Sequence, residues 1–399
     1  MLACVVGAMI PMTQKWLLPE YIDDILPGEA WRVENLRRGV LDLFALNGYE
    51  LVMPPLVEYL DSLLTGSGHD LGLRTFKLVD QLSGRTLGLR ADITPQASRI
   101  DAHLLNREGI TRLCYSGSVV HTLPSGLLKT REPLQIGAEI YGHAGVESDV
   151  EIQLLMLRAL ALAGVDDVHL NLGHVAIFRS IIQWARIDRE SEAELFRVLQ
   201  AKDEAALHAL TEPLDTDARK ALRALPELYG GVEVLDAARS KLPDFSELSE
   251  CLDTLEFLAE QLSGDVGELC VDLAELRGYH YHSGAVFAAY VPGRTDAIGR
   301  GGRYDEIGKA FGRARPATGF SIDLRDLAGL QSGDSAGERI MAPYRRDDAE
   351  LLKAIGALRD AGKIVIIDLP GHEGSRDELR CSSELVQRDG IWQVVPRQR

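Results

Sequence analysis

The amino-acid sequence predicts an α+β fold built on an antiparallel sheet that is flanked by helices. Two strand-like segments, residues 113–120 and 134–141, are joined by a polar loop and are expected to pair in antiparallel fashion. Residues 177–262 are rich in Ala, Leu and Glu and carry no strand signal. Strand patterns resume after them, at residues 269–273 and 285–291. Strands and helices segregated along the chain in this way are typical of α+β proteins.

An amphipathic helix and a hairpin are predicted before the first long strand. Apolar residues at helical spacing over residues 29–47 indicate one buried stripe, and Gly48 ends the pattern. The stripe consists of Trp31, Leu36, Val40, Leu43 and Phe44. Residues 76–79 and 86–90 alternate on either side of a Ser-Gly turn, which predicts a hairpin. A further helix is expected over residues 95–106, with a proline in its first turn.

The chain is expected to begin with an extension and a large domain. Residues 1–15 open with apolar, uncharged residues and lack the basic start of a secretion signal. We interpret them as a disordered extension or a consequence of the assigned start, because Met9 and Met12 are alternative starts. The large domain covers residues 16–330 and includes a helical insertion over about residues 177–262.

A small C-terminal α/β domain is expected over residues 331–399. It begins with a linker rich in Gly, Ser and Asp at about residues 331–338. Residues 351–358 then have a helical pattern and residues 364–369 a strand pattern.

Composition excludes some functions. The formal net charge of −17 and the lack of a Lys/Arg run argue against a nucleic-acid partner. No apolar run reaches the roughly 20 residues that a membrane span requires, so no membrane association is expected. The cysteines are scattered without metal-site spacing, which indicates reduced thiols and a cytoplasmic protein without a metal or other cofactor. They are Cys4, Cys114, Cys251, Cys270 and Cys381.

Residues 276–287 combine an arginine, two glycines and alternating Tyr and His residues ahead of an apolar strand. The glycines let the backbone turn and approach a ligand closely. Arg277 offers a planar fork of donors that suits a carboxylate. If the segment were a strand, its two tyrosines would share one face and its two histidines the other. Taken alone, the segment is more typical of an aromatic edge strand with a solvated arginine.

This segment resembles the Arg-Gly-Leu-Asp-Tyr-Tyr-Thr-Gly histidine-binding motif of histidyl-tRNA synthetases. It is still more similar to the version in their non-synthetase paralogues, the regulatory subunits of ATP phosphoribosyltransferase. Residues 48–55, 113–142 and 317–324 look like the three class II synthetase motifs, so the resemblance covers about residues 16–330. It implies a class II aminoacyl-tRNA synthetase-like fold and, through the first motif, a homodimer core.

The resemblance also implies a histidine-binding site made from separated segments. An acid and a threonine follow Arg90, two polar residues lie in the second motif, and an arginine and a tyrosine come from residues 276–287. Acids suit an α-ammonium and an imidazole, and an arginine suits a carboxylate. The sequence does not decide which group meets which ligand atom. The six residues are Asp92, Thr94, Gln135, Glu139, Arg277 and Tyr281.

The ATP contacts of the synthetases are not matched. His121 and Leu123 stand where the second motif has an arginine and a glutamate, and Asp326 stands at the arginine of the third motif on ungapped alignment. A leucine cannot bond a base, a neutral histidine does not replace a guanidinium, and an aspartate repels a triphosphate. Arg325, one position away, would restore one contact but not the pair. We expect no adenylation and no catalytic residue.

Two other features have simple interpretations. Residues 299–302 are glycine-rich but lack the Lys-Ser/Thr of a phosphate-binding loop, so we expect a tight turn that lines the amino-acid site. His280 and His282 lie two apart with no third ligand nearby, which is weak evidence for a metal.

Kept histidine contacts and lost ATP contacts lead to one main hypothesis. The resemblance implies a non-catalytic regulatory subunit that a short-form ATP phosphoribosyltransferase catalytic subunit needs in the first step of L-histidine biosynthesis. It would mediate feedback inhibition by L-histidine as a homodimer core within a hetero-oligomer. Two alternatives stay open: an active histidyl-tRNA synthetase, and a synthetase-like amino-acid-binding protein with another partner.

Overall fold

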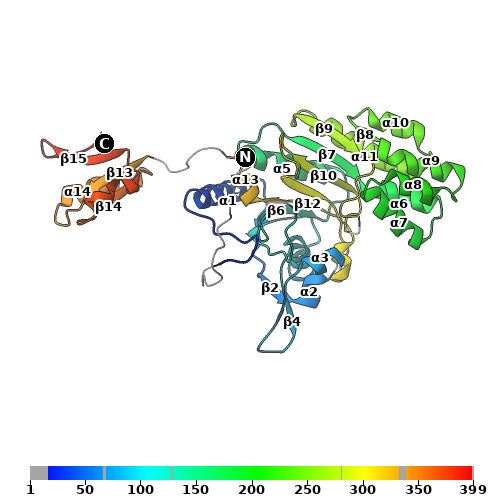
Figure 1. Ribbon diagram of the computed structural model, residues 1–399, viewed down its shortest axis with the longest axis horizontal. Coiled ribbons are helices and arrows are strands. Elements are labelled where there is room, and N and C mark those ends of the chain that lie inside the picture. The colour runs from blue at the N-terminus through cyan, green and yellow to red at the C-terminus, as the bar shows by residue number, and fades with distance from the viewer. Residues whose placement is uncertain (1–16, 66–68, 127–128, 280, 332–337, 398–399) are drawn as a thin grey trace, which may run out of the picture. The chain divides into compact units, whose positions relative to one another are not determined.

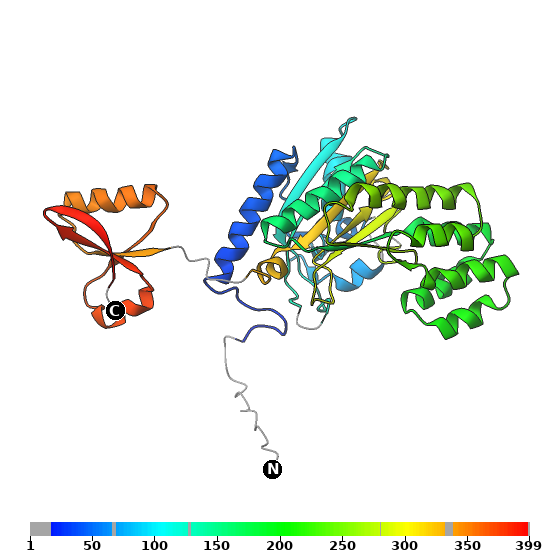
Figure 2. The same ribbon diagram turned by 90° about the horizontal axis from the view of Figure 1, so that it is seen from above.

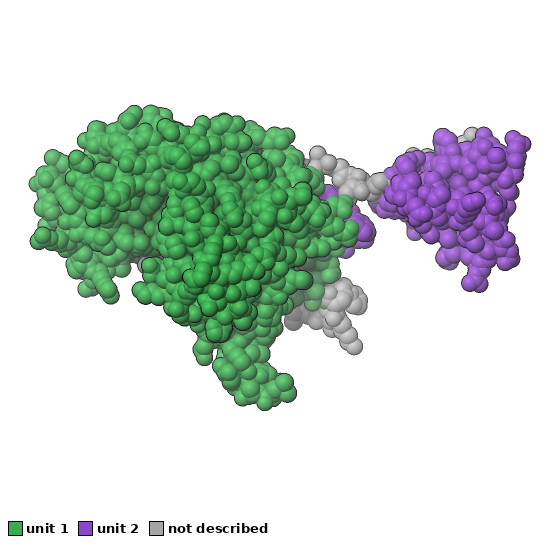
Figure 3. All heavy atoms as spheres, turned by 180° about the vertical axis from the view of Figure 1, so that it is seen from behind, with its two compact units in different colours: residues 1–25, 33–331 green, residues 26–32, 332–399 purple. Residues whose placement is uncertain are grey.

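The structure is a computed structural model that describes residues 17–65, 69–126, 129–279, 281–331 and 338–397 (Figure 1). The predicted N-terminal extension and nearly all of the predicted linker lie outside the described residues. The chain divides into two compact units (Figure 3). One comprises Met1–Ile25 and Val33–Gln331, and the other Leu26–Arg32 and Ser332–Arg399.

Nine strands of the described chain form the main sheet, in the order β1-β5-β6-β12-β11-β10-β7-β9-β8. The central pairs from β5 to β7 are antiparallel, whereas β1 pairs with β5 and β7 with β9 in parallel. The strands are β1 (Glu50–Leu51), β5 (Thr111–Ser118), β6 (Leu134–Tyr141), β7 (His169–His174), β8 (Tyr229–Gly230), β9 (Glu268–Asp272), β10 (Ala285–Tyr290), β11 (Gly299–Arg303) and β12 (Ala317–Asp323). The predicted pairing of β5 with β6 is confirmed, with Leu113 opposite Glu139.

Long helices pack on this sheet and complete the main core. Figure 2 shows α1 (Glu29–Leu46) and α5 (Glu147–Leu162) alongside the strands. In α1 the buried side chains recur every three or four residues, as in an amphipathic helix: Val33, Leu36, Val40 and Phe44. The prediction that Trp31 belongs to this stripe is wrong. Trp31 is 58% exposed. It precedes Val33 by two residues, and this spacing places it on nearly the opposite side of the helix.

The segment predicted as a helical insertion consists mainly of helices (green in Figure 1). They are α6 (Val175–Trp184), α7 (Arg189–Gln200), α8 (Glu204–Thr211), α9 (Thr216–Ala224), the short 3-10 helix η2 (Leu225–Glu227), α10 (Val234–Lys241) and α11 (Ser246–Leu262). Asp188, Asp203 and Asp215 cap three of them by accepting bonds from backbone N–H groups. The expectation of no strand is wrong at β8, whose two residues are too few to produce a periodic signal.

A smaller sheet and several short helices border the main sheet. The predicted hairpin is confirmed: β3 (Lys77–Val79) pairs with β4 (Thr86–Leu89), and β4 also pairs with β2 (Val57–Tyr59). The helix predicted over residues 95–106 is divided into α4 (Thr94–Arg99) and a π-helical turn, η1 (Ile100–Leu105). The remaining short helices of this unit are α2 (Leu60–Leu64), α3 (His69–Arg74), α12 (Ile307–Ala310) and α13 (Leu324–Ala328).

The glycine-rich residues expected to form a tight turn instead form strand β11 in the middle of the sheet. A Cβ atom at Gly301 would lie 2.2 Å from the Gly319 carbonyl oxygen and 2.4 Å from Cζ of Phe287. Glycine is therefore required for close packing between neighbouring strands and not for a reversal of the chain.

The smaller unit contains a four-stranded sheet in the order β14-β13-β15-β16. Its elements are β13 (Arg339–Pro343), α14 (Ala349–Asp360), β14 (Ile364–Asp368), η3 (Glu373–Leu379), β15 (Ser383–Arg388) and β16 (Ile391–Pro396). The predicted helix and strand correspond to α14 and β14. Leu351 and Ile355 of α14 pack against Ile340, Val365 and Leu385 of the sheet.

None of the described helices combines the length and the apolar character needed to cross a bilayer.

Candidate amino-acid-binding site

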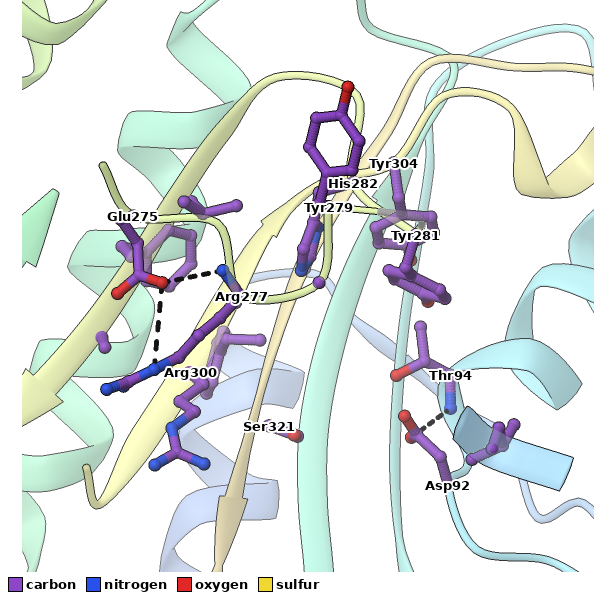
Figure 4. Close-up of a pocket in the computed structure, with 18 of the residues that line it drawn as sticks. Asp92, Thr94, Glu275, Arg277, Tyr279, Tyr281, His282, Arg300, Tyr304 and Ser321 are labelled. Carbon is purple, nitrogen blue, oxygen red and sulfur yellow. Dashed lines mark hydrogen bonds and ion pairs between the residues drawn. The ribbon is translucent and has the colours of Figure 1, made fainter. Parts of the chain in front are cut away.

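A cavity of about 670 Å³ lies within the main unit, against strands β6, β10, β11 and β12. The other walls come from two loops, one before α4 and one before β10, and from residues of α3, α7 and β7. Five of the six predicted residues line this cavity: Asp92, Thr94, Glu139, Arg277 and Tyr281. Segments that are far apart in the sequence therefore meet at one place, as Figure 4 shows.

The sixth predicted residue, Gln135, lines an adjoining cavity of about 230 Å³. Its Nε2 donates to Asp92 Oδ1 at 2.9 Å, and its Oε1 accepts from the Ile93 N–H at 2.9 Å. The backbone N–H of Thr94 donates to the same Asp92 oxygen at 3.0 Å. Gln135 thus fixes the orientation of the Asp92 carboxylate from behind.

Glu139 lies at the buried end of the cavity on β6. The Tyr115 hydroxyl donates to its Oε1 at 2.8 Å, and the Tyr304 hydroxyl donates to its Oε2. Burial raises the pKa of Glu139 to about 8, although these hydrogen bonds act in the opposite direction. A carboxyl group that holds its proton near neutral pH can either donate to a ligand or, once ionised, meet a cationic group.

Space around this carboxyl group depends on a glycine. A Cβ atom at Gly319 of β12 would lie 1.5 Å from Glu139 Oε2 and 2.8 Å from the Ala138 carbonyl oxygen. The close approach of two strands therefore leaves room for the Glu139 side chain only because residue 319 has no side chain.

The residues just before β10 form a turn, not part of the strand. Gly278 has φ +70°, and its carbonyl oxygen accepts from the N–H groups of Tyr281 and His282, at 2.7 Å each. The tyrosines at 279 and 281 therefore point in different directions (Figure 4). His280 lies outside the described residues.

The two tyrosines have different surroundings. The Tyr279 hydroxyl donates to Glu192 Oε1 of the helical insertion at 2.7 Å, and its ring packs on Phe178. The Tyr281 ring lies 5.2 Å from that of Tyr304. The Tyr281 hydroxyl is buried and has no hydrogen-bond partner among the described residues, so it is available to a polar atom of a ligand.

Arg277 lies at the other end of the cavity from Asp92 and Thr94 in Figure 4. Its Nη1 donates to the Tyr290 hydroxyl at 2.6 Å, and its Nε lies 3.8 Å from Glu275 Oε1. It also borders a third cavity of about 420 Å³. Arg277, which was predicted to bind the carboxylate of the ligand, therefore already interacts with side chains of the protein.

Sequence reasoning missed Tyr115, Tyr304 and Arg300 as site residues. Tyr115 lies in the second motif, Arg300 in the glycine-rich strand and Tyr304 directly after that strand. Tyr115 and Tyr304 bond Glu139, and Arg300 lines the cavity from β11. Their roles depend on pairing between strands, which the local sequence does not specify.

The region expected to lack ATP contacts is the adjoining 230 Å³ cavity. His121 is buried there, with a ring nitrogen 2.9 Å from the Ala91 carbonyl oxygen and 3.1 Å from Arg74 Nη2. Burial, aided by the charge of Arg74, lowers the pKa of His121. Leu123 is 71% exposed. These positions offer no fixed cation in place of the synthetase arginine.

An ion pair occupies one wall of the same cavity. Asp326 of α13 pairs with Lys129, so the acid neutralises the nearest lysine. Arg325 points to Thr130 Oγ1 at 3.3 Å and to the Glu132 carbonyl oxygen at 3.4 Å. Asp323 lies beside them, and burial raises its pKa to about 6. The cavity is lined by the bases Arg74, Lys129 and Arg300 and by the acids Asp92, Asp296, Asp323 and Asp326, so it offers no excess of positive charge to a triphosphate.

Within the described residues, no three or more His, Cys, Asp or Glu side chains gather closely enough to hold a metal ion.

Two family models match successive parts of the chain. Residues 21–327 match the model described as histidyl-tRNA synthetase. Residues 337–395 match the model described as the ATP phosphoribosyltransferase subunit HisZ C-terminal domain.

Curated relatives match nearly the whole chain. The ATP phosphoribosyltransferase regulatory subunit of Nitrosospira multiformis is 59% identical over 384 residues, which cover 95% of this chain and 98% of the relative. The regulatory subunit of Ralstonia pickettii is 57% identical over 386 residues, which cover 97% of this chain and 99% of the relative.

Solved structures have the same fold. An ATP phosphoribosyltransferase regulatory subunit/histidyl-tRNA synthetase from Bacillus halodurans matches with a TM-score of 0.81 and 26% identity, over 93% of this chain and 97% of that one. Histidyl-tRNA synthetase from Nostoc matches with a TM-score of 0.77 and 19% identity, over 96% of this chain and 97% of that one. The second similarity concerns the fold alone. The predicted class II synthetase-like fold is confirmed.

Proposed function

The chain belongs to the family of ATP phosphoribosyltransferase regulatory subunits, and from this membership we propose that it binds L-histidine and thereby controls a short-form catalytic subunit. The catalytic subunit performs the first step of histidine biosynthesis and needs this chain for activity. Histidine, the end product, inhibits the complex through this chain, which carries out no chemistry of its own.

One observation carries the proposal: a cavity suited to an amino acid adjoins a region unsuited to a nucleotide. Asp92 is oriented to accept bonds from an α-ammonium group. Glu139 and the unpartnered Tyr281 hydroxyl offer polar atoms to an imidazole at the buried end. An ion pair between Asp326 and Lys129 borders the adjoining cavity, where ATP would require cationic groups.

Regulation follows from linkage between two binding events. If histidine binds one arrangement of the complex better than another, it shifts the population towards that arrangement. A coupling of about 1–3 kcal/mol changes an affinity roughly 5- to 150-fold, which is enough for feedback. Occupancy of the catalytic subunit by its substrates must then change the affinity for histidine by the same factor.

A homodimer core is part of the proposal. The segment that resembles the first class II motif exposes large apolar side chains: Met53 is 84% exposed and Leu51 51%. Leu46 and Leu56, which flank the segment, are also exposed. Apolar side chains clustered on a surface favour a protein partner, and a second copy of the chain fits the resemblance. The domain limits at residues 16–330 and 331–399 stay predictions.

Direct binding tests the central part of the proposal. Calorimetric titration of the full chain with L-histidine is expected to give saturable binding to one site per chain. Asp92→Asn is expected to weaken it at least tenfold, because the variant loses the charge that meets the ammonium. Asp347→Asn, at an exposed position of the smaller unit, is the matched control and should bind as the wild type does. Absence of wild-type binding would contradict the proposal.

The match of residues 21–327 to histidyl-tRNA synthetase supports a second candidate, an active synthetase. The two functions differ in one measurable reaction. A synthetase exchanges pyrophosphate into ATP when histidine is present, whereas a regulatory subunit does not.

A further inference from the structure

We propose that Arg300, and not Arg277, is the principal contact for the carboxylate of the amino-acid ligand. This inference rests on the proposed function and assigns a binding role to a residue outside the six predicted ones. It concerns the main unit only, and all of its residues are described.

Arg300 is available to a ligand. It is the second residue of β11, opposite Ala288 of β10 and Ser321 of β12, so the backbone that carries it is held on both sides. Its side chain lines the main cavity, and among the described residues it has neither a hydrogen bond nor an ion pair. A guanidinium at a cavity wall without a protein partner can donate two parallel hydrogen bonds to a carboxylate.

Arg277 is less available. Its guanidinium already donates to the Tyr290 hydroxyl at 2.6 Å, and Glu275 lies 3.8 Å from its Nε. A ligand carboxylate at this arginine would approach the carboxylate of Glu275 as well, and like charges repel. Arg277 is better suited to close the cavity, with Glu275 and Tyr290 holding its side chain in place.

The covalent geometry of the ligand also favours Arg300 over Arg277 as the carboxylate contact. The ammonium and carboxylate of an α-amino acid are attached to the same carbon, so an acid and a base must meet them side by side. Arg74, Asp92, Arg300 and Ser321 line both the main cavity and the adjoining 230 Å³ cavity, so they mark the junction of the two. Arg74 is already engaged, because its Nη2 lies 3.0 Å from Nδ1 of the His121 ring. Arg277 borders the main cavity and the third cavity instead. The junction is therefore the place for the charged end of the ligand.

This placement leaves the rest of the cavity for the side chain of the ligand. Glu139, Tyr281 and Tyr304 lie beyond the junction and offer a carboxyl group and hydroxyl groups to an imidazole. A phosphate is a poorer occupant for Arg300, because Asp296, Asp323 and Asp326 also line the adjoining cavity and its other bases are engaged, Lys129 by Asp326 and Arg74 by His121. A zwitterion satisfies Asp92 and Arg300 together.

The test compares ligands with and without a carboxylate on the full chain. Binding of L-histidine, L-histidinol and histamine is measured by calorimetry, with weak ligands measured in competition with histidine. Arg300→Met is expected to weaken histidine roughly 10- to 100-fold, as loss of a charged hydrogen bond does. It should leave the affinities for histidinol and histamine within about twofold, since neither ligand has a carboxylate to lose. Arg300→Lys should recover part of the loss for histidine.

Two controls make the result specific. Arg277→Met should weaken the binding of histidine and of histidinol by similar factors, because that arginine would help to close the cavity and would not bind the carboxylate. Arg346→Met, at an exposed position of the smaller unit, removes the same charge and should change nothing. Circular dichroism and thermal melting establish that each variant is folded.

The outcomes separate this inference from the proposed function. If the wild type binds histidine and Arg300→Met binds it equally well, the inference is overturned and the function stands. If Arg300→Met weakens all three ligands alike, Arg300 supports the cavity in general and the inference is again overturned. If the wild type does not bind histidine at all, the proposed function and this inference fail together.

Discussion

Gln135 donates a hydrogen bond to Asp92 at 2.9 Å and accepts one from the Ile93 N–H at the same distance. Gln135 and Asp92 were both expected to contact histidine, but Gln135 lies behind Asp92. Asp92 lines the main cavity and Gln135 holds it in position. A residue matched to a binding motif can therefore act through its neighbour.

This relationship predicts the effect of Gln135→Leu. The substitution removes the donor to Asp92 and leaves the buried N–H of Ile93 without its acceptor, which costs about 1–3 kcal/mol of unfolding free energy. Histidine affinity should fall about tenfold, because the carboxylate of Asp92 is no longer held. Urea denaturation and calorimetry measure the two effects. Gln393→Leu, at an exposed position of β16, should change neither, and an unaltered affinity in Gln135→Leu would refute the supporting role.

Glu139 predicts how stability depends on pH. Its pKa of about 8 in the folded protein is above the ordinary value of 4.5, so the folded state binds more protons than the unfolded state between these values. The contribution of Glu139 to the free energy of unfolding should therefore be greatest below pH 4.5 and should fall as the pH rises towards 8.

The comparison of the wild type with Glu139→Gln between pH 6.5 and 8 isolates this group from others near it. Burial raises the pKa of Asp323 to about 6 and lowers the pKa values of His174 and His282 from 6.5 to about 4, so these three groups also affect the slope, but they affect both proteins alike. In ligand-free protein Glu139 should contribute a fall of at most about 1.4 kcal/mol per pH unit. Glu139→Gln should remove this contribution. Equal slopes in the two proteins, measured by urea denaturation at each pH, would show that Glu139 is already ionised.

A pair of glycine substitutions tests the packing around Glu139. Gly319→Ala places a Cβ atom 1.5 Å from Glu139 Oε2, so we expect loss of histidine binding and a drop in melting temperature of several degrees. Gly39→Ala in α1 meets nothing within 4 Å and should stabilise the helix by about 0.5–1 kcal/mol. Thermal melting and calorimetry of both variants provide the comparison. A Gly319→Ala protein that melts and binds as the wild type does would contradict the described packing.

The ion pair of Asp326 with Lys129 predicts that ATP does not bind in the adjoining cavity. Millimolar ATP should leave the melting temperature unchanged, whereas saturating histidine should raise it. Histidine-dependent exchange of labelled pyrophosphate into ATP should stay at background. A histidyl-tRNA synthetase assayed in parallel is the positive control, and exchange by this chain would instead support the synthetase alternative.

Elements with a strong periodic pattern could be predicted from the sequence. The pairing of β5 with β6, the hairpin of β3 and β4, and the helix α1 all have local signals in their residues. Errors occurred where long-range contacts decide. Gly301 belongs to a strand because Gly319 and Phe287 lie against it, and neither neighbour is close in the sequence. Glycine is equally compatible with a turn when it is considered alone.

In the candidate site, too, local motifs could be predicted from the sequence and long-range contacts could not. The motif match assembled five residues that line one cavity, because the family fold brings their segments together. It did not identify Arg300, whose importance depends on its position between β10 and β12 and on the engagement of Arg277 by Tyr290. The partner of a side chain is a property of the folded chain, and only the structure supplies it.

The measurement that tests the central claim most directly is phosphoribosyl-ATP formation by a short-form catalytic subunit from the same source. The rate is measured with and without this chain, over a titration of L-histidine, and with the Asp92→Asn variant in parallel. We predict that adding the chain raises the rate, that histidine reverses the increase, and that Asp92→Asn shifts this reversal to at least tenfold higher histidine. A rate that depends neither on the chain nor, in its presence, on histidine would contradict the account.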